Sequence, residues 1–127
     1  MSLPKQRVIP ALRITDDAVS KAYYVEKLGF SVEWEHRFEP HFPVFMSIHR
    51  DGMQLYLTQH KGDCEPGGLV HFVVEDVAAL YEELQERGAF VCEAPNDELG
   101  FLCMTVQDPD GNKLRFMEPS PNHLSGN

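Results

Sequence analysis

Several polar side chains of this chain occupy strand-like segments in which every second residue is apolar. Because side chains alternate along a strand, such polar residues should share one face of a sheet. A face with a few polar groups on an apolar wall has the composition of a small-molecule groove. The strand positions that we expect to bind a ligand are Ser47, Gln54, Tyr56, His71, Thr105, Lys113 and Arg115.

Three aromatic residues outside the core periodicity form a second group of candidates. Trp34, Phe38 and Phe42 lie in or just before the irregular segment 36–43, and acidic residues surround such segments: Glu33, Glu35, Glu39, Asp97 and Glu98. A cation held over an aromatic face gains about 0.5–2 kcal/mol. These residues therefore suit a flat, cationic ligand. The alternative is that Trp34 and Phe38 bury against a partner subunit or the end of the sheet.

Neither the cysteines nor the histidines are spaced like metal ligands. The three cysteines, Cys64, Cys92 and Cys103, contain no C-x-x-C pair and are odd in number, so neither a zinc ribbon nor a disulfide framework is predicted. No H-x₃-H spacing joins His36, His41, His49 and His60. We expect no metal and no other cofactor.

Composition limits the partners. The 127 residues carry 20 acidic and 11 basic side chains, for a formal charge of −9, which disfavours nucleic acids and anionic membranes and favours cationic ligands. A single domain, 1–127, is expected, with 43% apolar residues to build its core. The sequence shows neither a signal peptide nor a run of about 20 apolar residues. We expect a protein of the reducing cytoplasm.

One structural plan occurs twice along the chain. A β-rich run, an acidic helix cap, a helix pattern and a Gly-Phe or Gly-Ala-Phe segment recur at a spacing of about sixty residues, from Asp16 and from Asp76. Asp51-Gly52 and Asp110-Gly111 each predict a hairpin turn. The order is βαβββ twice, in modules 8–58 and 69–118 joined by a linker, 59–68. The fold class is α+β: a mixed, cleft-bearing sheet with outer helices.

Strand alternation also predicts the core. The apolar face should carry Val8, Leu12, Ile14, Met46, Ile48, Leu55, Leu57, Val70, Phe72, Val74, Met104, Val106, Leu114 and Phe116. Strands are expected at 8–14, 30–35, 44–49 and 53–58, then at 69–75, 89–93, 101–107 and 113–117. The apolar residues of the first helix are Val19, Ala22 and Tyr23, with Val25 as a further candidate, and that helix should stop at Gly29. Tyr56 and Arg115 occupy equivalent strands, so we expect them to face one cavity near His71.

The duplicated βαβββ order, with Tyr23-Tyr24 before Leu28-Gly29-Phe30 and with Asp108-Pro109-Asp110-Gly111-Asn112 before the last strand, resembles the glyoxalase/bleomycin resistance/dioxygenase superfamily, the vicinal oxygen chelate fold. The resemblance covers roughly residues 8–118. It implies a divalent-metal site in the enzymes, at positions that are Ile9, Tyr56, Leu69 and Arg115 in this chain. Ile and Leu have no donor atom and a guanidinium repels a metal cation, so this chain does not fit that site.

Among metal-free members, the chain is most similar to the bleomycin resistance proteins, through Ile9-Pro10, Leu99-Gly100 and the 108–112 segment. That resemblance implies a homodimer that traps a bleomycin-type glycopeptide in its clefts without enzymatic activity. It departs from the group at Leu99, where an aromatic residue is common. Two alternatives remain: a metal-dependent glyoxalase-like isomerase or ring-cleaving dioxygenase, and a sensor or housekeeping protein that binds another metabolite.

Overall fold

The computed structural model describes residues 6–119, which form two four-stranded mixed sheets. The first sheet has the order β1-β4-β3-β2 and the second the order β5-β8-β7-β6. The strands of the first are β1 (Ala11–Arg13), β2 (Ser31–His36), β3 (Phe45–Arg50) and β4 (Met53–Thr58). Those of the second are β5 (Leu69–Val73), β6 (Val91–Glu98), β7 (Phe101–Gln107) and β8 (Lys113–Pro119). The predicted α+β class and the repeated βαβββ order are confirmed.

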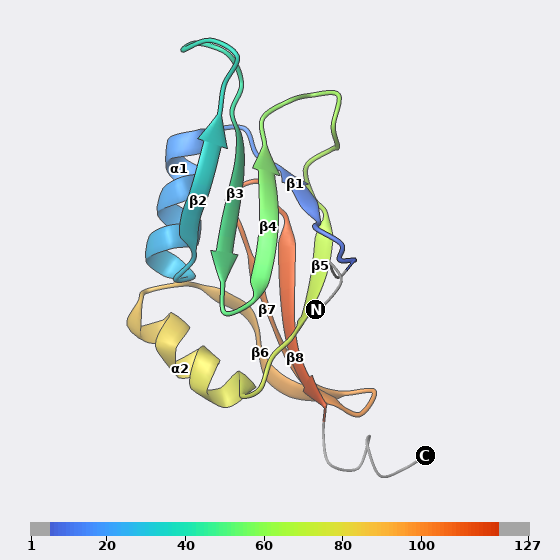
Figure 1. Ribbon diagram of the computed structural model, residues 1–127. Helices are drawn as coiled ribbons and strands as arrows, with labels where there is room; N and C mark the ends of the chain where they lie inside the picture. Colours follow the sequence, from blue (N-terminus) through green and yellow to red (C-terminus); the bar gives the residue numbers. More distant parts are fainter. Residues whose placement is uncertain (1–5, 120–127) are drawn as a thin grey trace, which may run out of the picture.

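The inner faces of both sheets and the helices share one apolar core. Figure 1 shows β2, β3 and β4 side by side, with α1 (Asp17–Ala22) and α2 (Val77–Glu86) at one side of the molecule. The core joins Leu57 of the first half to Leu84 and Phe116 of the second. Within the part of the chain that the structure describes, no helix is long and apolar enough to cross a membrane.

Most of the predicted core is buried, with Val8 as the clear exception. Val8 is 90% exposed, because β1 pairs with β4 only from Ala11 to Arg13 and the residues before it lie outside the ladder. Pro10 has no amide hydrogen to donate, although its carbonyl accepts a bond from the Tyr56 amide at 2.9 Å. Val70 and Val74 pack against the core while remaining partly exposed.

In the first helix, Ser20 and Tyr24, four residues apart, face the core, whereas the apolar Val19 and Ala22 are exposed. After α1 the chain continues as a π-helical turn, η1 (Tyr23–Lys27), in which the Leu28 amide bonds to the Tyr23 carbonyl at 3.1 Å. Tyr24 lies near the start of this turn and is fully buried. Val19 is left 49% exposed.

The buried Tyr24 joins the two halves of the chain. Its hydroxyl donates to the Asp108 carboxylate at 2.8 Å, and burial together with that carboxylate raises the pKa of the phenol well above its usual range. Asp108 also accepts bonds from Asn112, whose side-chain amide donates to the Arg13 carbonyl at 2.8 Å. The backbone amides of Gly67 and Gly68 donate to the side-chain Oδ1 of Asn112. The 108–112 segment is therefore a junction that ties β1, η1 and the linker to β8.

Candidate functional site

The open face of the first sheet carries an aromatic cluster that a β-bulge creates. In β2, Val32 pairs with Ile48, but Trp34 pairs with Ser47, so the register shifts by one residue at Glu33. The extra residue moves the Trp34 side chain from the core face to the open face. There its ring stacks on Phe45, with centroids 5.9 Å apart and an interplanar angle of 13°, and lies 5.7 Å from Tyr56. Trp34 is 41% exposed.

A carboxylate lies beside this aromatic cluster of Trp34, Phe45 and Tyr56. The Ser47 hydroxyl donates to Glu33 Oε1 at 2.9 Å, and Gln54 Nε2 donates to the Ser47 hydroxyl at 2.9 Å. Ser47 is fully buried, and its hydroxyl makes its hydrogen bonds with these two neighbours. Glu33 is exposed, and its carboxylate is bonded to Ser47, the residue that pairs with both Trp34 and Tyr56 across the sheet. This face therefore combines flat apolar rings with a negative charge.

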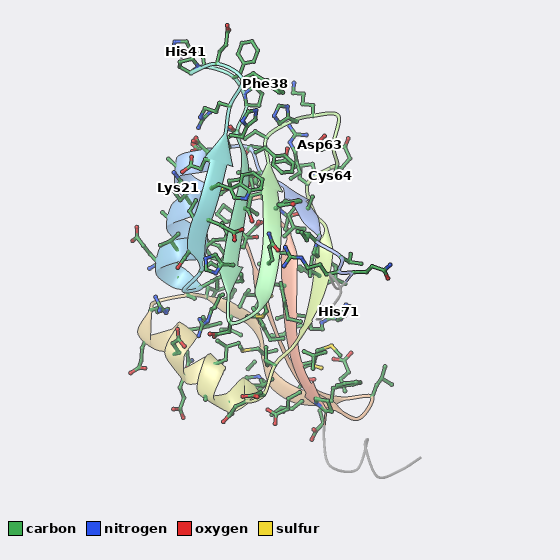
Figure 2. All side chains as sticks on the ribbon, viewed as in Figure 1. Lys21, Phe38, His41, Asp63, Cys64 and His71 are labelled. Atoms are coloured by element: carbon green, nitrogen blue, oxygen red, sulfur yellow. The ribbon has the colours of Figure 1, made fainter. Side chains whose placement is uncertain are left out.

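The other predicted aromatic residues lie away from that cluster. Figure 2 shows Phe38 and His41 on the loop beyond the ends of β2 and β3. Phe38 contacts the rings of His36 and His60, at 4.9 and 6.5 Å. Phe42 is 45% exposed, and its carbonyl accepts a bond from Arg37 at 2.8 Å.

The open face of the second sheet has a cationic cluster instead. Arg115 donates from Nε to Thr105 Oγ1 at 3.1 Å, its Nη1 lies 3.5 Å from His71 Nε2, and its Nη2 lies 3.7 Å from Glu93 Oε1. A second register shift in β6 sets Glu93 opposite Thr105, as Trp34 stands opposite Ser47. Thr105 is almost fully buried and Lys113 is exposed.

The structure brings His71 to Arg115 as expected, whereas Tyr56 lies on the other sheet. Among residues 6–119, no hydrogen bond, ion pair or ring contact joins Tyr56 to Arg115. Each half therefore presents its own open face, one aromatic and acidic, the other cationic.

Two cavities lie elsewhere on the molecule. The first, of about 510 Å³, is lined by residues that include Arg50 and Glu83, which pair at 2.6 Å. The second lies along α1 and β2. None of the predicted ligand residues lines either cavity. The candidate residues on the two sheet faces are therefore separate from these two cavities.

Comparison with known proteins places this architecture in a family. The sequence-family model described as glyoxalase superfamily protein matches residues 2–122 of this chain. The chain belongs to the glyoxalase superfamily.

One curated relative and two solved structures show the extent of the similarity. YetH, an uncharacterized protein of Bacillus subtilis (strain 168), is 24% identical over 119 residues, which are 90% of this chain and 98% of YetH. The antibiotic binding protein TnmS3 from Streptomyces sp. CB03234 has a TM-score of 0.73 and 22% identity, over 94% of this chain and all of TnmS3. A bleomycin-binding protein complexed with bleomycin has a TM-score of 0.72 and 22% identity, over 91% of this chain and all of that protein.

The residues of this chain at the metal-ligand positions of the superfamily's enzymes are poor metal ligands. Leu69 is 49% exposed, and neither it nor Ile9 has a donor atom. Arg115 places a cation where a ligand would be required, already held by Thr105 and Glu93. Within residues 6–119, no three His, Cys, Asp or Glu side chains converge on a point that could hold a metal ion.

Sequence reasoning missed Phe45 and Glu93 as members of the two open faces. Phe45 alternates with Ser47 along β3, so strand periodicity could have placed it beside Trp34. Glu93 lies at a bulge, and a bulge reverses the facing that simple alternation assigns.

Proposed function

We propose that this protein binds a flat, cationic small molecule of the bleomycin type, holds it without transforming it, and so sequesters it. The aromatic cluster carries the proposal: the rings of Trp34 and Phe45 are nearly parallel, Tyr56 is tilted against both, and Glu33 is bonded to Ser47 on the same face. Planar heterocycles stack on such rings, and a cationic tail pairs with the carboxylate. The formal charge of −9 attracts a cation from a distance.

The fold shared with TnmS3 and the bleomycin-binding protein supports the ligand class. Micromolar affinity needs about 8 kcal/mol, and one cation–π contact supplies at most about 2 kcal/mol, so one face alone is too little. We therefore propose a homodimer in which a second copy supplies the opposite wall of the cleft. Exposed apolar side chains on the second sheet, Leu69 at 49% and Val73 at 67%, suit burial by such a wall. The three free cysteines suit a reducing cytoplasm.

Titration with copper-loaded bleomycin tests this function. Trp34 is the single tryptophan of the chain, so its fluorescence reports directly on the aromatic cluster. We expect saturable quenching at micromolar ligand, together with protection of plasmid DNA from cleavage by iron-loaded bleomycin. No quenching at tens of micromolar ligand, with no protection of the DNA, would refute the proposed ligand while leaving the fold unaffected.

The same purified protein distinguishes the two alternative functions. An isomerase or dioxygenase of this superfamily would contain a stoichiometric transition metal that a chelator removes together with an activity. A metabolite sensor would be stabilised in a thermal-shift screen by other small molecules, anionic ones above all, and not by bleomycin.

A further inference from the structure

Arg13 is a buried cation that lacks a carboxylate partner. Its residue is only 9% exposed, yet no Asp or Glu oxygen within residues 6–119 comes within ion-pair distance of its guanidinium. Its Nε is buried without any hydrogen-bond acceptor, and its Nη1 reaches only the Cys64 carbonyl, at 3.4 Å. A buried charge is normally paired and hydrogen-bonded, so an unpaired guanidinium calls for an anion from outside the chain.

The other arginines that the structure describes differ from Arg13, because each is either paired with a carboxylate or exposed. Arg37, Arg50, Arg87 and Arg115 each pair with a carboxylate. Arg7 has no such partner but is exposed to water, which solvates its charge. Arg13 alone among the described arginines is both buried and without a carboxylate.

Strand register places Arg13 on the same face as the aromatic cluster. Arg13 pairs with Thr58 of β4, and Thr58 pairs with Phe45 of β3. Paired residues of neighbouring strands point to the same side of a sheet, so the Arg13 side chain lies in one row with Phe45. Tyr56 belongs to the next row on this face, opposite Ser47.

Arg13 and Glu33 therefore flank the aromatic rings at opposite ends. Glu33 accepts a bond from Gln54, two residues before Tyr56 on β4, while Arg13 stands beside Thr58, two residues after it. Successive residues on one face of a strand are about 7 Å apart, so the two charges can contact the two ends of one flat ligand. The linker borders the Arg13 end: Thr58 donates to Asp63 at 2.8 Å, and Figure 2 shows Asp63 and Cys64 on the loop beside β1 and β4.

We infer that the aromatic face has an anion subsite at Arg13, so that its ligand is a planar molecule carrying a carboxylate or a similar oxyanion at one end. The guanidinium donates to the oxyanion, and the rings of Phe45 and Tyr56 hold the planar part. This inference rests on the proposed ligand face but not on bleomycin as the ligand. It narrows the proposed cationic ligand to a zwitterion whose cation reaches Glu33.

Three probes that differ only in charge test the subsite: 2-naphthoate, 2-naphthalenemethanol and 2-naphthylmethylammonium. Dissociation constants are measured from the shift of the Trp34 indole N–H resonance. We expect the wild-type protein to bind naphthoate about tenfold more tightly than the neutral alcohol, the ratio that a charge-assisted hydrogen bond supplies. The Arg13→Gln variant should lose that preference. Lys61→Gln, which removes an exposed cation from the linker, should keep it.

Two results would overturn the subsite. One is a wild-type protein that binds naphthoate no better than the alcohol, which needs no variant to observe. The other is a preference that survives Arg13→Gln. If bleomycin fails to bind but the protein still prefers naphthoate to the alcohol, the sequestration function is refuted and the anion subsite is supported.

The melting temperature of the ligand-free protein gives an independent test. Arg13→Met removes an unpaired buried charge while keeping most of the side-chain volume, so it should raise the melting temperature. A lower melting temperature in Arg13→Met would show that the guanidinium is already paired in solution, for example by Asp63, and would contradict the inference.

Discussion

Replacing Asp108 with alanine should lower the free energy of unfolding by about 3–5 kcal/mol. The carboxylate accepts bonds from the Tyr24 hydroxyl, from the Asn112 side-chain amide, and from the backbone amides of Asp110 and Asn112. Asp108 is 4% exposed, so water cannot replace the lost acceptor without entering the core. Each hydrogen bond to a charged group contributes about 1.5–3 kcal/mol, and the four bonds share one acceptor carboxylate, so their losses do not add in full.

Urea unfolding followed by circular dichroism measures this effect. Asp97→Ala is the matched control, because Asp97 is an exposed acidic residue on β6, and its replacement should change stability by less than about 0.5 kcal/mol. A loss below about 1 kcal/mol in Asp108→Ala would contradict the view that the 108–112 segment ties the two halves together.

Replacing Trp34 with alanine should weaken binding of copper-loaded bleomycin by about 30-fold or more. Large aromatic side chains at the centre of an interface contribute about 2 kcal/mol or more when they are truncated, which corresponds to that loss. Trp34 is 41% exposed and contacts only Phe45 and Tyr56 among the rings, so its removal should leave the fold intact. The loss should therefore appear in the dissociation constant and not in the stability.

Isothermal titration calorimetry is the suitable measurement, since the variant has no tryptophan fluorescence. Phe90→Ala serves as the control: Phe90 is 76% exposed and belongs to neither open-face cluster. Equal affinity of Trp34→Ala and the wild-type protein would place any binding away from the aromatic cluster. Equal losses in both variants would indicate binding driven by exposed aromatic residues in general.

The sequence predicted the parts of this fold that follow a regular period. Leu55 and Leu57, which alternate with Tyr56 on β4, are buried, and Tyr56 lies on the opposite face as predicted. The DG turn signals and the acidic caps at Asp16 and Asp76 also correspond to the observed strand and helix ends. These features depend on local backbone geometry, which residue type controls directly.

Irregularities that interrupt the helix or strand periodicity could not be predicted from the sequence in this way. The π-helical turn at Tyr23–Lys27, with its buried Tyr24, was not predicted, and the bulge at Glu33 brought Trp34 to the open face. Both depend on long-range partners, such as Asp108 for Tyr24, whose position the local sequence does not encode. The missing partner of Arg13 is likewise visible only once β1, β4 and the linker are assembled.

The most direct test of the ligand face is a titration with metal-free bleomycin followed by amide and indole resonances. The single indole N–H, that of Trp34, should shift, along with amides of β3 and β4 that surround Phe45 and Tyr56. Amides of Ala79 and Leu80, which line the separate cavity beside α2, should stay in place. Shifts confined to Ala79, Leu80 and their neighbours, with an unmoved Trp34 resonance, would contradict the account.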